Sequence, residues 1–141
     1  MKRMLIYMDF FQKKNPAIIH LQGNSLTYDF SKLNKKFDVI FIDGDHHYES
    51  VKADTENVFK HLVHDKSIVI WHDYAYNPEK VRPELMAAIL DGTPKDKKAK
   101  VYHVSNTLCA IYINESFATT ELKEYNIPSK VFEITIESKS L

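Results

Sequence analysis

Two short polar stretches follow apolar runs in this chain. "DGDHH" (Asp43 to His47) comes directly after "FDVIFI", and the pair His72 and Asp73 comes directly after "SIVIW". Carboxylates held close to one another repel, and a divalent cation between them relieves that repulsion. Mg²⁺ prefers oxygen ligands, whereas Zn²⁺ or Mn²⁺ also accepts an imidazole nitrogen. The two stretches therefore predict a divalent-metal site if the fold brings them together.

The apolar runs before these residues have the length and composition of buried strands. Residues 37–43 and 67–73 are rich in β-branched and aromatic side chains, as strands covered on both faces are. Between them, apolar side chains recur at three- and four-residue steps, which predicts a helix lying on the sheet. Those side chains are Val51, Thr55, Val58, Phe59 and Leu62. This strand–helix–strand order predicts parallel strands whose carboxyl ends share one rim, where ligands bind in open α/β sheets.

The rest of the chain continues an α/β pattern. We expect strands at 17–22, 100–105, 108–113 and 130–137, and a short helix within 1–14. A further helix should begin at Pro83 and end just before Gly92, which would adopt a left-handed conformation. Its expected buried residues are Leu85, Met86, Ile89 and Leu90. The charged residues of the helix after "DGDHH" predict a solvated face, formed by Glu49, Lys52, Asp54, Glu56 and Lys60.

The composition fits one globular domain spanning residues 1–141. Apolar residues make up 44% of the chain and charged residues 27%, which is ordinary for a folded protein. Nineteen basic and nineteen acidic side chains cancel, so the basic footprint of a nucleic-acid-binding protein is missing. No stretch approaches the roughly 18 apolar residues of a membrane span, and the single cysteine, Cys109, fits a reducing compartment. We therefore expect a cytoplasmic protein with no nucleic-acid or membrane partner.

The two polar stretches also resemble a known family. "FDVIFIDGDHHYESVKADTENVFKHL" followed by "SIVIWHDY" is similar to the second half of class I S-adenosylmethionine-dependent methyltransferases, specifically the small-molecule and sugar O-methyltransferase-like group with D-G-D-H-x-Y and H-D-Y motifs. The likeness covers about residues 18–113. It implies a three-layer, Rossmann-like, mainly parallel sheet with an antiparallel strand pair at its C-terminal side. It also implies S-adenosylmethionine as cofactor and a small-molecule methyl acceptor.

Carried over residue by residue, the resemblance assigns roles at the two strand ends. Asp43, His72 and Asp73 become ligands of Mg²⁺ or another divalent metal, and His46 becomes a general base. A cation that binds the acceptor hydroxyl lowers the pKa of that hydroxyl, and a neutral imidazole can then accept its proton. The predicted function is O-methyl transfer from S-adenosylmethionine to a small molecule.

One part of that family's cofactor site has no counterpart in this sequence. The family holds its cofactor with a glycine-rich turn after the first strand, whereas the three glycines here, Gly23, Gly44 and Gly92, are isolated. We therefore expect an N-terminally truncated domain with an incomplete sheet, in which strand 37–43 lacks a neighbour on one side. Exposed strand edges invite pairing. Strand 17–22, strand 130–137 or a second copy in a homodimer would cover this edge.

Several of these residues also have plain structural explanations. Asp43–Gly44 is ordinary turn chemistry, Asp45 can cap the following helix, and His46–His47 can be loop residues. Trp71 and Tyr74 suit the core better than a pocket. Two alternatives to a methyltransferase therefore stand: a catalytically inactive binding or oligomerisation module, and a metal-dependent hydrolase.

Overall fold

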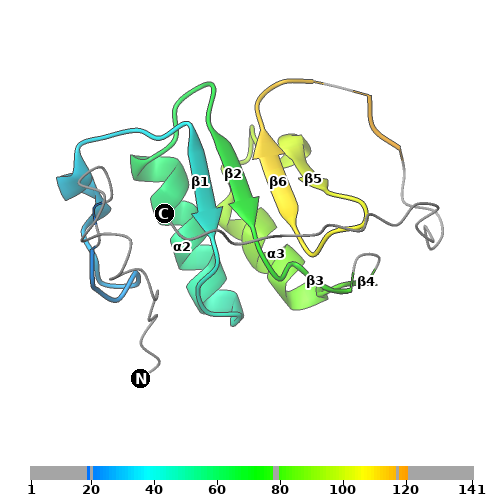
Figure 1. Ribbon diagram of the computed structural model, residues 1–141, viewed down its shortest axis with the longest axis horizontal. Coiled ribbons are helices and arrows are strands. Elements are labelled where there is room, and N and C mark those ends of the chain that lie inside the picture. The colour runs from blue at the N-terminus through cyan, green and yellow to red at the C-terminus, as the bar shows by residue number, and fades with distance from the viewer. Residues whose placement is uncertain (1–18, 20, 78–79, 117, 121–141) are drawn as a thin grey trace, which may run out of the picture.

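A four-stranded mixed sheet with helices on one side forms the centre of the protein (Figure 1). The computed structural model describes residues 19, 21–77, 80–116 and 118–120. The strands, in their order across the sheet, are β1 (Val39–Ile42), β2 (Ile68–Trp71), β6 (Ala110–Ile113) and β5 (Val101–His103). A separate two-stranded hairpin, β3 (Ala75–Asn77) and β4 (Lys80–Val81), follows β2.

The predicted strand–helix–strand unit is confirmed. β1 and β2 are parallel and in register from Val39 opposite Ile68 to Ile42 opposite Trp71. The crossover between them is α2 (Tyr48–His61), which buries Val51 and other apolar residues of its stripe against the sheet. Parallel strands need such a crossover, and this one places both strand ends on the same rim.

The prediction of a mainly parallel sheet is wrong for the described residues. β1 pairs with β2 in parallel, but β2 with β6 and β6 with β5 pair antiparallel. The reason is that β6 lies between β2 and β5 and runs opposite to both of them. β5 and β6 form the antiparallel strand pair that the resemblance implied, and the turn between them includes Asn106 in a left-handed conformation, with φ of 61°.

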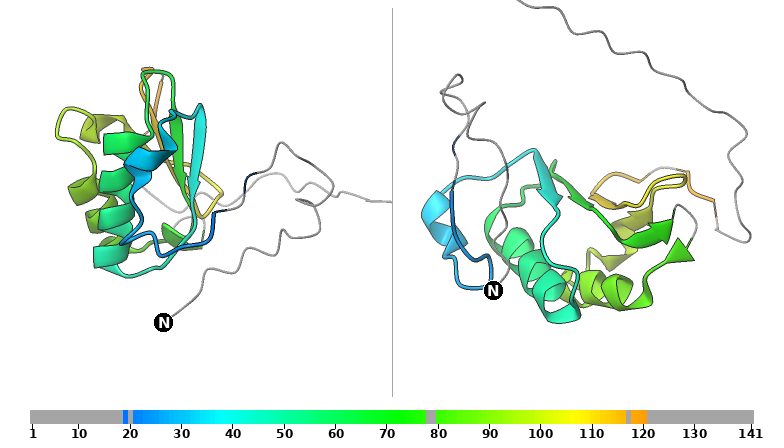
Figure 2. Two further views of the ribbon diagram at one scale, coloured as in Figure 1. Left: turned by 90° about the vertical axis from the view of Figure 1, so that its left-hand side faces the viewer. Right: turned by 60° about the horizontal axis from the view of Figure 1, so that its bottom comes forward.

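The expected three layers are also not found, because the described helices lie on one face of the sheet (Figure 2). α2 and α3 (Pro83–Gly92) cover that face, and the core between helices and sheet includes Val69, Trp71 and Ile89. On the other face, Val39 is 59% exposed and Phe41 is 55% exposed. Residues 37–43 were expected to be buried on both faces; the structure covers only one face, where Ile40 and Ile42 are half-buried.

The helix predicted at 83–92 is present, but Gly92 has a different role from the one expected. It is the last residue of α3, without a left-handed backbone, and Thr93 caps the helix. A Cβ at Gly92 would lie 2.6 Å from the Lys52 carbonyl oxygen and 2.7 Å from Cβ of Thr55. Glycine is therefore required here for the close approach of α3 to α2. Met86 is 39% exposed and does not belong to the buried face.

Some predicted elements fall on residues that are not described. The helix within 1–14 and the strand at 130–137 lie outside the described residues. Of the strand predicted at 17–22, Ile19, Leu21 and Gln22 are described and belong to no strand. Two 3₁₀ helices, η1 (Phe30–Leu33) and η2 (Lys98–Lys100), complete the described elements. None of the helices in the described part of the chain is both long and apolar enough to cross a membrane.

Candidate metal and catalytic site

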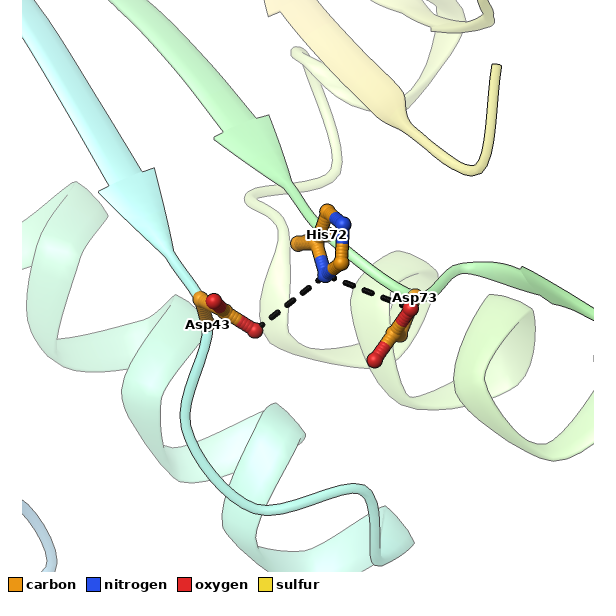
Figure 3. Close-up of side chains that lie close together, drawn as sticks. All are labelled: Asp43, His72 and Asp73. Carbon is orange, nitrogen blue, oxygen red and sulfur yellow. Dashed lines mark ion pairs between the residues drawn. The ribbon is translucent and has the colours of Figure 1, made fainter. Parts of the chain in front are cut away.

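The carboxyl ends of β1 and β2 carry the two polar stretches to one place. The ladder between the strands continues one step past β2, where the His72 amide donates a hydrogen bond of 3.0 Å to the Ile42 carbonyl oxygen. Asp43, the residue after Ile42, is therefore held beside His72. Figure 3 shows the side chains of Asp43, His72 and Asp73 turned toward one another.

Three potential ligand atoms converge there. Nδ1 of His72 lies 3.2 Å from Oδ1 of Asp43 and 3.2 Å from Oδ1 of Asp73. All three ligand atoms lie within 4.8 Å of one another. The predicted metal residues are thus brought together by the fold, although they come from two separate strand ends.

The surroundings of the His72 nitrogen fit a cation. Nδ1 is buried, and among the described residues neither nearby carboxylate makes a hydrogen bond to it with acceptable geometry. Two ligand atoms at right angles and about 2.1 Å from one cation are about 3 Å apart, which is close to both His72 contacts. Two carboxylate oxygens and one imidazole nitrogen suit Mn²⁺ or Zn²⁺ as well as Mg²⁺. The donor types and the two His72 distances therefore suit a divalent metal, and these three residues are its candidate ligands.

The backbone at Asp73 contributes to this arrangement. Asp73 has φ of 52°, in the left-handed region. Aspartate and asparagine tolerate this region better than most residues. Directly after Asp73, the chain is fixed by a hydrogen bond of 2.9 Å from the Arg82 amide to the Tyr74 carbonyl oxygen. The turn thus lets the side chains of consecutive residues His72 and Asp73 approach the same point.

The predicted base, His46, lies beside the same cluster. Its Nε2 is 3.0 Å from Oδ2 of Asp73, and its side chain is 41% exposed. Asp73 therefore faces His72 with one oxygen and His46 with the other. In the neutral imidazole, an Nε2–H donated to this carboxylate leaves the lone pair on Nδ1. That tautomer can accept a proton from a substrate while Asp73 holds the ring.

Asp45 and His47 are tied to each other at the edge of the site. Oδ1 of Asp45 accepts the His46 amide at 2.8 Å and lies 2.7 Å from Nδ1 of His47, while Oδ2 accepts the Ser50 hydroxyl at 2.9 Å. The hydrogen bond with the His47 ring is the main cause of a lowered pKa of Asp45. The cap residue of α2 is His47, with no side-chain cap bond. Asp45 thus fixes the loop rather than accepting the first amides of the helix.

A small hollow opens next to these residues. Its lining includes Asp43, His46 and His72 on one side and Leu85 and Ile89 of α3 on the other. It offers about 10 Å³, which is room for about one water molecule. Trp71 also borders it but is almost fully buried, with its indole N–H donating to the Thr55 hydroxyl at 3.0 Å. S-adenosylmethionine is far too large for this hollow.

Asp54 was not among the site residues predicted from the sequence. We predicted that it lies on the solvated face of α2, but only 9% of the residue is exposed. The spacing contained the signal, because Asp54 follows Val51 by three residues and precedes Val58 by four. These steps place it on the buried stripe of the helix. Its Oδ2 lies against Gly44, in the loop that follows β1.

The comparison with protein families covers this part of the chain. Residues 7–74 match a family described as a methyltransferase domain. The match supports a methyltransferase-family domain, and it extends over just under half of the chain. The methyltransferase match contains β1, α2 and β2 and ends directly after Asp73, so it includes Asp43, His46, His72 and Asp73. None of the curated proteins and none of the solved structures compared with the chain matches it.

Proposed function

We propose that this protein takes part in O-methyl transfer from S-adenosylmethionine to a small-molecule hydroxyl, assisted by a divalent cation. The proposed ligands are Asp43, His72 and Asp73, and the proposed base is His46. One observation carries the proposal. Two carboxylates and a buried imidazole nitrogen, which accepts no hydrogen bond from the described residues, converge inside a stretch that matches a methyltransferase domain.

Each residue of the site has a separate role in the proposed reaction. A bound cation lowers the pKa of a hydroxyl that it binds. His46 accepts the hydroxyl proton on Nδ1, while Oδ2 of Asp73, 3.0 Å from Nε2, stabilises the imidazolium that forms. Asp45 fixes the backbone at His46 through its amide. The remaining contribution is alignment of the acceptor oxygen with the methyl group and sulfur.

A second candidate function is a binding or oligomerisation module without catalysis. It is favoured by the isolated glycines of the sequence and by the small size of the hollow. In either case we propose that a second copy of the chain pairs with β1, which is the edge strand of the described sheet. The second copy would also cover Val39 and Phe41, which are exposed on the face of β1 away from the helices. A small-molecule acceptor would then bind at the cation, and the cofactor would bind outside the hollow.

Titration calorimetry of the full chain with S-adenosylmethionine, with and without Mn²⁺, tests the proposal. We expect binding tighter than about 100 µM in the presence of Mn²⁺, which corresponds to about −5.5 kcal/mol. We also expect Mn²⁺ alone to bind, as measured by loss of the free-ion electron paramagnetic resonance signal. The Asp43→Asn variant should lose Mn²⁺ binding.

The outcomes separate the candidates. Mn²⁺ binding without any heat from S-adenosylmethionine would support the non-catalytic module. No binding of either would contradict the proposed function. Ester cleavage that needs a metal but no cofactor, and that Asp73→Asn abolishes, would instead identify a metal-dependent hydrolase.

A further inference from the structure

Asp54 is a buried carboxyl that the proposed reaction does not use. It projects from α2, and its Oδ1 is shielded from solvent without a hydrogen-bond partner among the described residues. Leaving a buried carboxyl oxygen unpaired is costly, so a group of this kind needs a reason for its place. The two exposed carboxylates of α2, Glu49 and Glu56, carry no such cost.

The Asp54 carboxyl supports the turn at Gly44. A Cβ added to Gly44 would lie 3.3 Å from Oδ2 of Asp54, which is tighter than ordinary van der Waals contact. The carboxyl therefore occupies the space into which a larger residue at position 44 would project. The absence of a side chain at Gly44 lets the turn rest directly on Asp54.

Gly44 connects the two halves of the candidate site. Asp43 precedes it, and Asp45 and His46 follow it. A displacement of the Gly44 backbone would therefore move a proposed ligand and the proposed base together. The loop is held on α2 at two points, because Ser50 also donates its hydroxyl to Asp45 at 2.9 Å.

The electrostatic surroundings of Asp54 agree with a buried location. Burial raises the pKa of the Asp54 carboxyl; the nearby Ser25 hydroxyl opposes the rise, and the charge of Asp45 adds to it. Ser25 belongs to the segment before η1. Asp54 thus belongs to the packing of α2 against the Gly44 turn.

We infer that Asp54 is a positioning residue, which packs against Gly44 and holds Asp43 and His46 in the arrangement that binds the cation and accepts the proton. This inference rests on the proposed function, since it presupposes a cation at Asp43, His72 and Asp73. Its basis is the shape and placement of the carboxyl group rather than its charge.

Titration of the full chain with Mn²⁺, followed by electron paramagnetic resonance, tests the inference. Asp54→Ala should weaken Mn²⁺ binding by about tenfold or more, as loss of a group supporting the ligands does. Asp54→Asn, which keeps nearly the same shape, should bind within about threefold of the unaltered protein. The matched control is Glu56→Gln, on the exposed side of the same helix, which should bind Mn²⁺ like the unaltered protein.

Either of two results in the Asp54 variants would overturn the inference without affecting the proposed function. The first is an unchanged Mn²⁺ affinity in a folded Asp54→Ala variant. The second is an equal loss of Mn²⁺ affinity in Asp54→Asn and Asp54→Ala, because the affinity would then depend on the charge of the carboxyl group rather than on its shape. If Asp54→Ala does not fold, Gly44→Ala takes its place, and its added methyl group should weaken Mn²⁺ binding several-fold without changing the circular dichroism spectrum. Unchanged affinity in Gly44→Ala would overturn the inference as well. Failure of the unaltered protein to bind Mn²⁺ would instead overturn the proposed function, and this inference with it.

Discussion

The two ends of the parallel strand pair each bring an aspartate and a histidine together, but with different results. At the amino end, Nε2 of His64 lies 3.0 Å from Oδ1 of Asp38, and Nδ1 of His64 accepts the Lys66 amide at 3.1 Å. Both ring nitrogens are therefore used. At the carboxyl end, the buried Nδ1 of His72 lies between two carboxylates without a hydrogen bond from the described residues.

This difference shows what separates a structural pair from a candidate site. The amino end has a single carboxylate beside a single imidazole, and this exposed ion pair contributes little to stability. The carboxyl end gathers two carboxylates and two imidazoles, with Asp73 facing both His46 and His72. Residue types alone would not distinguish the two ends. The distinguishing feature is that, within the described part of the chain, Nδ1 of His72 has no hydrogen-bond partner.

The largest expected effect is on the rate of methyl transfer. It should distinguish His46, at the carboxyl end of the strand pair, from His64, at the amino end. His46→Gln should lower the rate of methyl transfer by about 10²- to 10⁴-fold, because it removes the proposed base. His64→Gln should leave the rate unchanged. The measurement is transfer of a radiolabelled methyl group to a panel of hydroxyl acceptors at saturating Mn²⁺. Equal rates in the two variants would show that His46 is not the base.

The next largest effect is on Mn²⁺ affinity, and it should distinguish Asp73, at the carboxyl end, from Asp38, at the amino end. Asp73→Asn should weaken Mn²⁺ binding by about 100-fold, or about 2.7 kcal/mol, while Asp38→Asn should leave it unchanged. Both variants lose one negative charge, and asparagine tolerates the left-handed backbone at position 73. A loss of affinity common to both variants would mean that net charge, rather than ligand geometry, governs binding. Electron paramagnetic resonance with Mn²⁺ gives both affinities.

A smaller effect should appear in stability, and at the amino end. Ser67 is fully buried; its hydroxyl donates to the Phe37 carbonyl oxygen at 2.7 Å and accepts the His64 amide at 2.8 Å. Ser67→Ala leaves both backbone groups unpaired and should lower the free energy of unfolding by about 1–3 kcal/mol. The control is Ser50→Ala at the carboxyl end, with an expected change below about 0.5 kcal/mol. Urea denaturation measures both, and the reverse order would contradict the comparison.

The smallest effect is the pH dependence that Asp45 contributes. Its hydrogen bonds with His47 and Ser50 lower its pKa in the folded state below the ordinary value of 3.8. The folded protein therefore binds fewer protons here than the unfolded chain, so this contribution is present above pH 3.8 and lost as the pH falls through the folded pKa. Asp45→Asn should lower the melting temperature slightly at about pH 5 and not at the acid end of the range. A difference that grows toward acid pH would contradict this assignment.

Much of the local structure could be predicted from sequence patterns. The apolar run of β1, the stripe of α2 and the bracketing of α3 each reflect interactions within a few residues. The positions of Asp43 and of the pair His72 and Asp73 followed from the rule that parallel strands end on one rim. The error at Asp54 arose from weighing its charge above its position on the buried stripe.

The remaining features depend on contacts between distant segments. Asn106 marks a turn in the sequence, but only the pairing of β6 with β2 makes the sheet mostly antiparallel. The sequence predicts that a helix ends at Gly92, and only the close approach of α3 to Thr55 shows why this residue must be glycine. These outcomes depend on which surfaces meet, which local spacing does not specify.

The sequence by itself determined which residues end β1 and β2 and that these strands run in parallel, because side-chain periodicity and the crossover helix act locally. Only the tertiary structure decided that the His72 nitrogen lies buried between two carboxylates, that Asp73 also holds His46, and that Asp54 lies beneath Gly44. The physical reason is that hydrogen-bond geometry and burial are properties of segments packed together, and the residues in question come from three different parts of the chain.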